Sequence, residues 1–383
     1  MFGADATSTW HVQWASQQWH ADAAARYATS RAALATNATA VVADSQRYYL
    51  PVEYVSPWLH TATLTNLRAN TTYFYQCGDG AGDGWGDVFN FTTPVPLSTS
   101  SPRRTRIAMV GDVGQTANSA ATIASIAKLA TSGAVDFMML PGDLSYANFD
   151  FKRWDSWGRL VQPLFSTLPV AVAPGNHELF DLFESYTRRF RMPVSKNGDG
   201  GEQPMYYSVE YQNVHIVALN AETFDGHLHF EKQYQWLKAD LQSVVRSRTP
   251  WVIVFFHEPF YCSNKIHENS NWMMRVEYEQ LMLDTKVDVV LAGHVHAYER
   301  TTRIAHGKVG SGPVHLTVGT GGNHEGLYDH WETPPPAWSV FHQGSSYGYG
   351  VFDAVNATTA TWQYVSSSTG AVLDSAVFTR AAA

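Results

Sequence analysis

Side chains that bind metal ions recur in the second part of this sequence, each just after an apolar segment. They are Asp112 after IAMVG, Asp143 after FMMLPG, Asn176 and His177 after VAVAPG, His257 after VIVFF, and His294 and His296 after VVLAG. Carboxylates, an amide oxygen and imidazoles together suit Zn, Mn and Fe. One carboxylate can bridge two ions, and paired ions about 3.5–4 Å apart clamp a phosphoryl group. These residues therefore predict a two-metal site for phosphoryl chemistry.

Each of these elements also has a purely structural explanation. Gly-Asp after a strand is commonly a turn, and His294 and His296 would face opposite ways in a regular strand. Turns alone do not explain why all five elements occur at the ends of apolar segments. Their joint occurrence favours the metal-site interpretation.

Alternating strands and helices are expected to position these side chains. We expect strands at 106–112, 136–143, 168–177, 214–220, 251–257 and 287–296, and helices at 117–133, 151–165 and 231–245, with a further helix before 287. This alternation predicts an α/β sheet with helices on its faces. Ligands of such sheets bind outside the carboxyl ends of the strands, which is where the donor side chains follow. The tail from residue 349 has the pattern of β-hairpins.

Residues 1–93 have the pattern of an all-β domain. Short runs rich in aromatic and β-branched residues lie at 9–16, 60–67, 71–78 and 87–93, separated by turn residues. Residues 61–80 resemble the later strands of a fibronectin-III-like sandwich, whose first strand we expect to be missing. The Pro/Ser-rich stretch 94–104 is typical of a linker, which leaves 105–383 as the second domain.

Composition excludes several classes of protein. With 45% hydrophobic and 16% charged residues, the 383-residue chain is expected to be a folded globular protein. No run of 18 apolar residues occurs, so we expect no membrane span. The net charge of −8 argues against nucleic acid as a partner. An anionic substrate would need local positive charge, for which bound metal is the obvious source.

Cysteines and glycosylation sequons bear on the compartment. Cys77 and Cys262 are too few for a disulfide scaffold, and they are either bridged or free. Four N-x-[ST] sequons, at Asn37, Asn70, Asn90 and Asn356, favour a secreted or lumenal glycoprotein. Residues 1–12 do not have the form of a signal peptide, so the chain is either a trimmed mature form or located elsewhere.

Five short blocks resemble those of the purple acid phosphatases, in the order of that family. They are GDVG (111–114), GDLSY (142–146), GNHE (175–178), VFFH (254–257) and GHVH (293–296). Related metallophosphoesterases usually carry D-x-H in the first block and lack the tyrosine that stands here as Tyr146. The resemblance extends to the N-terminal sandwich and the tail. It implies a metallophosphoesterase β-sandwich flanked by helices and preceded by a fibronectin-III-like domain.

The resemblance also implies a ligand set and its metals. The ferric site would comprise Asp112, Asp143, Tyr146 and His296. The divalent site would comprise Asp143 as a bridge, Asn176, His257 and His294. The implied cofactors are Fe(III) and a divalent metal, namely Zn, Mn or Fe(II). A phenolate is a hard, anionic donor that suits Fe(III), and its charge transfer to iron gives the family its colour.

The sequence GNHE occurs twice, at 175–178 and at 322–325. The first copy follows an apolar strand and stands between Asp143 and His257, where the metal-binding block of the family belongs. The second copy resembles a family loop that lines the site region without supplying a metal ligand. We therefore expect Asn176 to bind metal, and His324 to be incidental.

His177 and His267 are the catalytic candidates. His177 follows a ligand and can contact a phosphate oxygen or protonate a leaving group, although it could also merely support its neighbours. His267 matches a family histidine on the loop after VFFH; alternatively it is an ordinary surface residue. Where the family often has an Asp that orients the first histidine, this chain has Asn148, a neutral amide that supports a protonated His177 less well. Cys262 is not expected to be a nucleophile.

The implied reaction is hydrolysis of phosphate monoesters at acidic pH by a metal-bound hydroxide on an Fe(III)–M(II) centre. The substrate would be a small-molecule phosphate ester. One alternative is a phosphodiesterase or nucleotide pyrophosphatase on the same two-metal site. Another is a non-catalytic, secreted binding protein that uses the N-terminal sandwich. The presence of all seven ligands argues against this last alternative.

Overall fold

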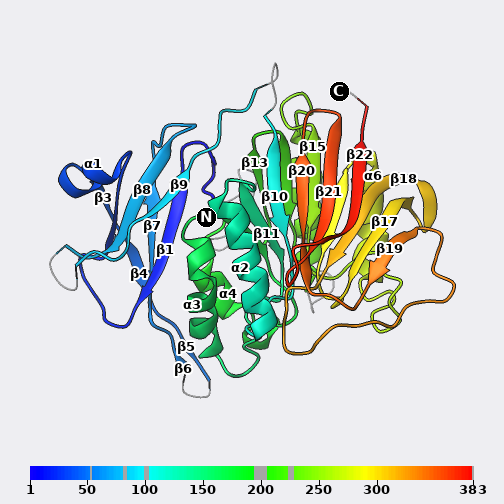
Figure 1. Ribbon diagram of the computed structural model, residues 1–383, viewed down its shortest axis with the longest axis horizontal. Coiled ribbons are helices and arrows are strands. Elements are labelled where there is room, and N and C mark those ends of the chain that lie inside the picture. The colour runs from blue at the N-terminus through cyan, green and yellow to red at the C-terminus, as the bar shows by residue number, and fades with distance from the viewer. Residues whose placement is uncertain (52–53, 81–83, 99–102, 194–204, 223–227, 382–383) are drawn as a thin grey trace.

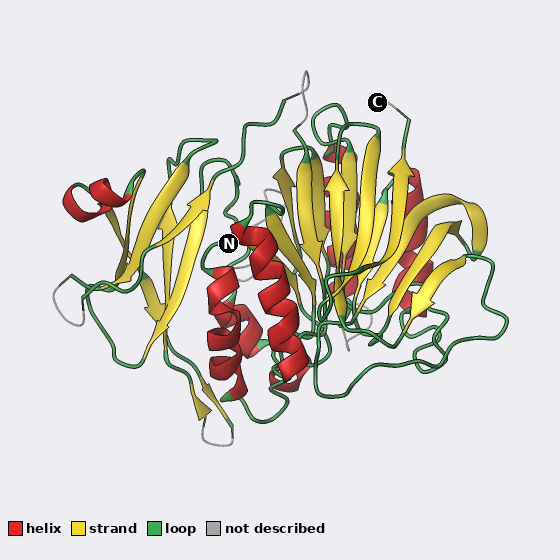
Figure 2. Ribbon diagram, viewed as in Figure 1, coloured by secondary structure: helices red, strands yellow, loops and turns green. Residues whose placement is uncertain are grey.

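The computed structural model describes residues 1–51, 54–80, 84–98, 103–193, 205–222 and 228–381. The strands of this part of the chain form five sheets, three of them near the N-terminus and two large ones in the second part (Figures 1 and 2). No helix within these ranges is both long and apolar enough to cross a membrane.

The first part of the chain is built from two facing sheets and a short hairpin. One sheet contains β1 (Trp10–Ser16), β7 (Trp58–Leu64) and β4 (Asp44–Gln46). The other contains β3 (Thr39–Val42), β2 (Ala24–Ala28), β8 (Thr72–Gly78) and β9 (Phe89–Thr92). The hairpin pairs β5 (Tyr49–Leu50) with β6 (Tyr54–Val55), and the short helix α1 spans Arg31–Thr36. Trp10 of one sheet stacks on Phe91 of the other with 4.4 Å between ring centroids. The four strands expected here are therefore confirmed.

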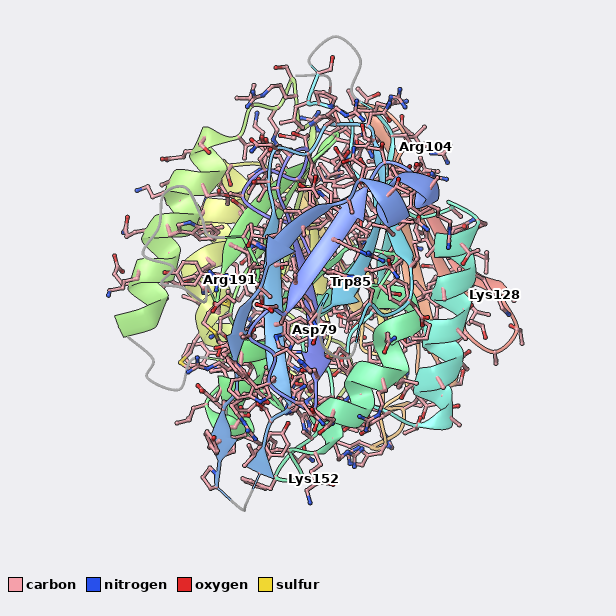
Figure 3. The ribbon with its side chains drawn as sticks, turned by 90° about the vertical axis from the view of Figure 1, so that its left-hand side faces the viewer. Asp79, Trp85, Arg104, Lys128, Lys152 and Arg191 are labelled. Atoms are coloured by element: carbon pink, nitrogen blue, oxygen red, sulfur yellow. The ribbon has the colours of Figure 1, made fainter. Side chains whose placement is uncertain are left out.

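Figure 3 looks at this part of the chain from its outer side, where Asp79 and Trp85 lie near the middle of the view. Trp85 pairs with Gly78 through an isolated bridge, and the guanidinium of Arg26 lies 4.5 Å from the centroid of its ring. Trp85 is thereby held against the sheet.

The second part of the chain contains two large mixed sheets. The six-stranded sheet runs in the order β12 (Val170–Ala173), β11 (Phe137–Pro141), β10 (Thr105–Met109), β20 (Gly348–Ala354), β21 (Thr359–Ser366) and β22 (Val372–Thr379). The seven-stranded sheet runs in the order β13 (Tyr207–Tyr211), β14 (Val214–Ala218), β15 (Trp251–Phe255), β16 (Val289–Ala292), β18 (Lys308–Val318), β17 (Tyr298–Ala305) and β19 (Ser339–Gln343). The two sheets form the implied β-sandwich, a split that the alternation of strands and helices does not reveal.

Helices cover the outer faces of this sandwich (Figure 2). The helical segments of the described residues in this part of the chain are α2 (Ala117–Thr131), α3 (Arg153–Phe165), the 3-10 turn η1 (Leu179–Asp181), α4 (Glu184–Arg189), α5 (Leu228–Ser243) and α6 (Trp272–Asp284). Alternation along β15 shows the layering, because Ile253 and Phe255 belong to the main core whereas Val252 and Val254 pack in the cluster formed with α5 and α6. The predicted strands and helices thus occur, each within a few residues of its expected ends.

Helix α3 lies between the N-terminal sheets and the six-stranded sheet (Figure 1). The hydroxyl of Tyr75 on β8 donates to the carbonyl of Ser166 at the end of α3, at 2.7 Å. Arg189 donates to Asp155 of α3 at 2.7 Å and to the hydroxyl of Tyr54 on β6 at 2.5 Å. These bonds attach both the N-terminal sheet and its hairpin to the second part of the chain.

Candidate metal centre

All seven predicted ligands lie just beyond the carboxyl ends of strands or in the loops that follow them. The strands concerned are β10, β11 and β12 in one sheet and β15 and β16 in the other. Each set of strands is parallel, so their carboxyl ends lie together, and the sandwich brings the two edges side by side. The structure therefore brings together residues that are far apart in the sequence.

Left-handed backbone conformations make the sharp turns at these strand ends. The φ angles are 59° at Asp112, 53° at Asp143, 51° at Tyr146 and 65° at His294, although none of these residues is glycine. The turn at His294 interrupts the extended backbone, so His294 and His296 do not alternate as they would in a strand. Both side chains therefore reach the centre, so their separation by two residues does not argue against a shared metal site.

The first group of donors contains Asp112, Tyr146 and His296. The Tyr146 hydroxyl lies 3.1 Å from Oδ1 of Asp112 and 2.9 Å from Nε2 of His296. Nε2 of His296 is 3.4 Å from the same carboxylate oxygen. All three side chains are buried. The phenol oxygen, a carboxylate oxygen and an imidazole nitrogen thus converge on one point.

The second group contains Asn176, His257 and His294, with Asp143 beside it. The amide oxygen of Asn176 is 3.0 Å from both Nε2 of His257 and Nδ1 of His294. Oδ2 of Asp143 is 3.2 Å from Nε2 of His257. One donor atom each of Asp112, Asp143 and His257 lies within 4.8 Å of the others. Asp143 therefore stands where a carboxylate can join the two groups.

The chemistry of the second group fits a metal ion. Nδ1 of His257 lies 2.8 Å from the Pro141 carbonyl, which can only accept, so this nitrogen carries a proton and Nε2 is left for a metal ion or a second proton. Nε2 of His257 and Nδ1 of His294 are 3.3 Å apart and both face the Asn176 oxygen. Although burial opposes it, the Asp143 carboxylate raises the pKa of His257 well above its usual value. The surroundings thus favour positive charge here.

Tyr146 fits a cation of high charge. Burial, together with the carboxylates of Asp112 and Asp143, raises the pKa of the phenol well above its usual value. The hydroxyl therefore keeps its proton unless a strongly charged ion takes the proton's place. This is the behaviour required of a tyrosine that binds a ferric ion but not of one that binds a weakly charged ion.

Glu178, the last residue of the first GNHE copy, holds two ligand loops together. Its buried carboxylate accepts three backbone N–H bonds of 2.9 Å, from Asp143, Leu144 and Gly175. Burial and the Asp143 charge raise the pKa of Glu178 to about 8. A Cβ atom at Gly175 would collide with the Asp143 carboxylate, so this close approach requires glycine. The GNHE motif contains Glu178, but the sequence alone did not predict this role.

His177 faces the centre beside the first group. Its ring Nδ1 lies 2.5 Å from the amide oxygen of Asn148, so the amide can still orient the ring in the absence of a carboxylate. Nε2 lies 3.5 Å from Oε1 of Glu325 and 3.8 Å from Oδ2 of Asp143. A carboxylate that the sequence did not suggest, that of Glu325, therefore stands near the nitrogen that would contact substrate.

The second GNHE copy lines the centre without supplying a donor to either group. The Asn323 amide donates to the Asp112 carbonyl at 3.2 Å, which supports the first ligand loop. Glu325 approaches His177, as described, and its Oε2 lies 3.9 Å from Nε2 of His296. The exposed His324 contacts the Tyr146 ring at 5.6 Å between centroids. Glu325 is therefore a site residue that the sequence did not predict.

His267 reaches the other side of the centre. Its ring lies 4.5 Å from that of His294 and stacks on Tyr328 at 5.3 Å between centroids. Its Nε2 is buried, and within the described part of the chain it has no hydrogen-bond partner. Cys262 on the same loop is free, and burial raises the pKa of its thiol; Cys77 is free as well. The first alternative for the cysteines, a bridge, is thereby excluded.

Two further glutamates lie beside the second group. Oε1 of Glu258 is 3.9 Å from Nε2 of His294. Glu222 follows β14, and its Oε1 is buried with no hydrogen-bond partner among the described residues. Neither residue belongs to a family block, but both follow strand ends, and this position is a signal in the sequence that could have identified them.

Comparison with known families supports this architecture along most of the chain. Residues 105–298 match the model of the calcineurin-like phosphoesterases. Residues 2–93 match the N-terminal domain of purple acid phosphatases, and residues 312–375 match the C-terminal model of iron/zinc purple acid phosphatase-like proteins.

Individual proteins are also similar to this chain in sequence or in fold. The chain is 41% identical to purple acid phosphatase 18 of Arabidopsis thaliana, over 82% of this chain and 70% of that protein. It is 34% identical to the Fe(3+)-Zn(2+) purple acid phosphatase 12 of the same plant, over 81% and 69%. The fold is similar to that of the yellow lupin purple acid phosphatase PPD1, with a TM-score of 0.87 and 23% identity, over 99% of this chain and 73% of that one. The chain therefore belongs to the purple acid phosphatase family and is an acid phosphatase, an enzyme that hydrolyses phosphate monoesters.

Proposed function

We propose that the two groups of donors bind a ferric ion and a divalent ion, Zn, Mn or Fe(II). The ferric ligands are Asp112, Asp143, Tyr146 and His296, and the divalent ligands are Asp143, Asn176, His257 and His294. The observation that carries this proposal is the separation of the donors into two groups with Asp143 beside both. The relative named as an Fe(3+)-Zn(2+) enzyme supports the choice of metals.

When bound, the two ions activate water for attack on phosphorus and neutralise charge on the phosphoryl oxygens. The protein residues have the remaining tasks. The backbone N–H of His177 donates to Oδ1 of Asp143 at 2.8 Å and so fixes the direction of that carboxylate. His177 and His267, which approach the centre from different loops, hold phosphate oxygens and deliver a proton to the departing alkoxide. The carboxylate of Glu325 lies 3.5 Å from Nε2 of His177 and places negative charge beside that ring.

The proton-donor role can be tested with leaving groups of different basicity. An alkyl alcohol needs a proton as it leaves, whereas nitrophenolate hardly does. We expect His177→Ala or His267→Ala to lower kcat on an alkyl phosphate by about 10²–10⁴-fold, and on nitrophenyl phosphate much less. His324→Ala, which removes an exposed histidine nearby, is the matched control. Equal losses on both substrates in both variants, with metal content intact, would show that the two histidines only bind phosphate.

The substrate is a small-molecule phosphate ester. A nucleic acid and a membrane are both disfavoured as partners, the first because the net charge of −8 repels a polyanion. We therefore expect the natural ester to be recognised at the metal centre itself, by the metals and by His177 and His267.

We further propose that residues 1–93 form a fibronectin-III-like domain and residues 105–383 the catalytic domain. The linker 94–104 between them lies partly outside the described residues. We expect the protein to be secreted or lumenal and to be glycosylated, because the sequon residues Asn37, Asn70 and Asn356 are exposed and accessible to glycosylation.

A further inference from the structure

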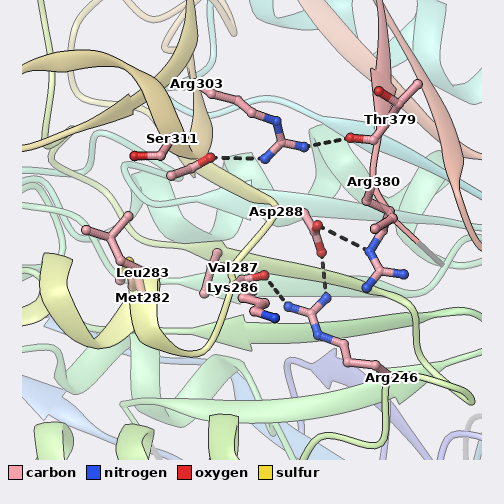
Figure 4. A pocket seen from close by; sticks show the side chains of 12 residues that line it. Arg246, Met282, Leu283, Lys286, Val287, Asp288, Arg303, Ser311, Thr379 and Arg380 are labelled. Atoms are coloured by element: carbon pink, nitrogen blue, oxygen red, sulfur yellow. Dashed lines mark hydrogen bonds and ion pairs between the residues drawn. The ribbon is translucent and has the colours of Figure 1, made fainter. Parts of the chain in front are cut away.

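A basic pocket lies at the end of the seven-stranded sheet opposite the metal centre. Its cationic side chains come from separate elements, namely Arg246 after α5, Lys286 before β16, Arg303 in β17 and Arg380 after β22 (Figure 4). Asp288 in this pocket directly precedes β16, whereas His294 of the metal centre follows that strand. At a rise of about 3.3 Å per residue, the two sites are roughly 20 Å apart.

The basic pocket carries excess positive charge. Among the described residues that line it, Asp288 alone is acidic, so one carboxylate faces four cations. This carboxylate already accepts from Nη1 of Arg246 at 2.6 Å and from the backbone N–H of Val252 at 2.9 Å, and Nε of Arg380 is 3.6 Å away. A single Asp288 therefore leaves most of the positive charge without a counterion, in a chain whose net charge is −8.

Two of the cations have tasks in the fold. Arg246 donates to the carbonyls of Pro250 and Thr285, at 2.8 Å and 3.1 Å, as well as to Asp288. Arg303 joins β18 to β22 by donating to the carbonyls of Gly312 at 3.0 Å and Thr379 at 2.9 Å. Carbonyl groups satisfy hydrogen bonds but carry no net charge. The carbonyl contacts therefore hold the two guanidinium groups in place without neutralising them, and of the two Arg246 is the one that also pairs with the Asp288 carboxylate.

The other two cations keep donors free for a ligand. Lys286 is exposed, and its ammonium group makes no hydrogen bond or ion pair with any described residue. Arg380 donates through Nη1 to the Ala357 carbonyl at 3.1 Å, and no described residue accepts from its Nη2. Burial lowers the pKa of Arg380, and the charges of Arg246 and Arg303 add to this against the attraction of Asp288. A bound anion would relieve this repulsion.

The size and chemistry of the basic pocket indicate its ligand. The cavity has a volume of about 640 Å³, within the range of small-molecule sites, and Met282, Leu283 and Val287 add apolar surface beside the cations. Guanidinium and ammonium groups are preferred partners of phosphate oxygens. We propose that this pocket binds a phosphate group, either as free inorganic phosphate or as part of a small phosphorylated molecule.

Equilibrium dialysis of the metal-loaded enzyme with labelled inorganic phosphate tests the proposal. We expect two equivalents per chain, one at the metal centre and one in the basic pocket. Lys286→Gln should weaken the second equivalent about tenfold, because it removes one charge-assisted hydrogen bond, and should leave the first equivalent and turnover unchanged. Lys308→Gln is the matched control, since it removes an exposed lysine of β18 that does not line the pocket.

Phenylphosphonate, which is not hydrolysed, distinguishes the two sources of phosphate. If it displaces the second equivalent at lower concentration than inorganic phosphate does, the ligand is a phosphorylated organic molecule that also uses the apolar surface. If it is the weaker competitor, the ligand is free phosphate. A wild type that binds a single equivalent, or a second equivalent of equal strength in Lys286→Gln and Lys308→Gln, would overturn the proposal.

Discussion

Replacing Glu178 is expected to disrupt the metal centre although this residue binds no metal. Its carboxylate accepts three backbone N–H bonds, from Asp143, Leu144 and Gly175, all at 2.9 Å. In Glu178→Ala these three donors lose their partner at a buried position. An unsatisfied buried donor costs about 1–3 kcal/mol. Allowing for partial relaxation of the two loops, we expect the free energy of unfolding to fall by about 3–5 kcal/mol.

Urea unfolding of the metal-stripped protein measures this effect without a contribution from metal binding. Glu178→Gln should be milder, because its one oxygen can still accept from two donors while its NH₂ group faces the third. Glu184→Ala is the matched control, since Glu184 forms a partly exposed pair with Arg188 four residues later, at 2.9 Å. Such a pair contributes about 0.3–0.5 kcal/mol.

Metal content gives the second readout. The Glu178 bonds hold the backbone of Asp143, the proposed bridging ligand, so Glu178→Ala should lose iron and the divalent metal together. The reasoning is refuted if Glu178→Ala unfolds at the same urea concentration as Glu184→Ala and retains both metals. In that case the loops of the metal centre would be held by other contacts.

Two further predictions concern the ligands themselves. Asn176→Ala should abolish binding of the divalent metal, whereas Asn323→Ala, which removes a bond to the Asp112 carbonyl, should retain it; equal metal loss in elemental analysis would contradict the distinction between the GNHE copies. Tyr146→Phe should remove the visible absorption band of the oxidised enzyme, because the phenol oxygen next to Asp112 and His296 is the proposed iron ligand. A colourless wild type with a full complement of iron would disprove that assignment.

Six of the seven proposed ligands were accessible from the sequence pattern because each closely follows a buried strand, whereas Tyr146 was suggested only by the family resemblance. A strand end fixes where the next side chain stands, and the parallel strands gather those ends at one edge of the fold. The elements themselves were also predictable, since the 15-residue α2 begins at a Thr116 cap and has its apolar residues at helical spacing. Local pattern was therefore sufficient for these elements and for the six donors at strand ends.

Contacts between segments that become neighbours only through the order of the strands could not be predicted from local sequence patterns. The tail strand β20 pairs with β10, so residues 105–109 lie beside residues 350–354, a neighbour relation that no local pattern encodes. The same holds for Glu325, which reaches His177 only because its loop returns past the ends of β10 and β11. The basic pocket likewise gathers Arg246, Lys286 and Arg380 from distant elements.

The left-handed turns at the centre connect these observations. Non-glycine residues in this conformation cost of the order of 1–3 kcal/mol each, so such turns persist where other bonds over-determine them. The Asp143 N–H is held by Glu178, the Asp112 carbonyl by Asn323, and the His294 N–H by Oδ2 of Asp112 at 2.9 Å. Glu178 and Asn323 hold these turns, yet neither is a metal ligand of the family blocks. Candidate ligands can therefore be proposed from short blocks, whereas the contacts that make those side chains converge belong to the tertiary structure.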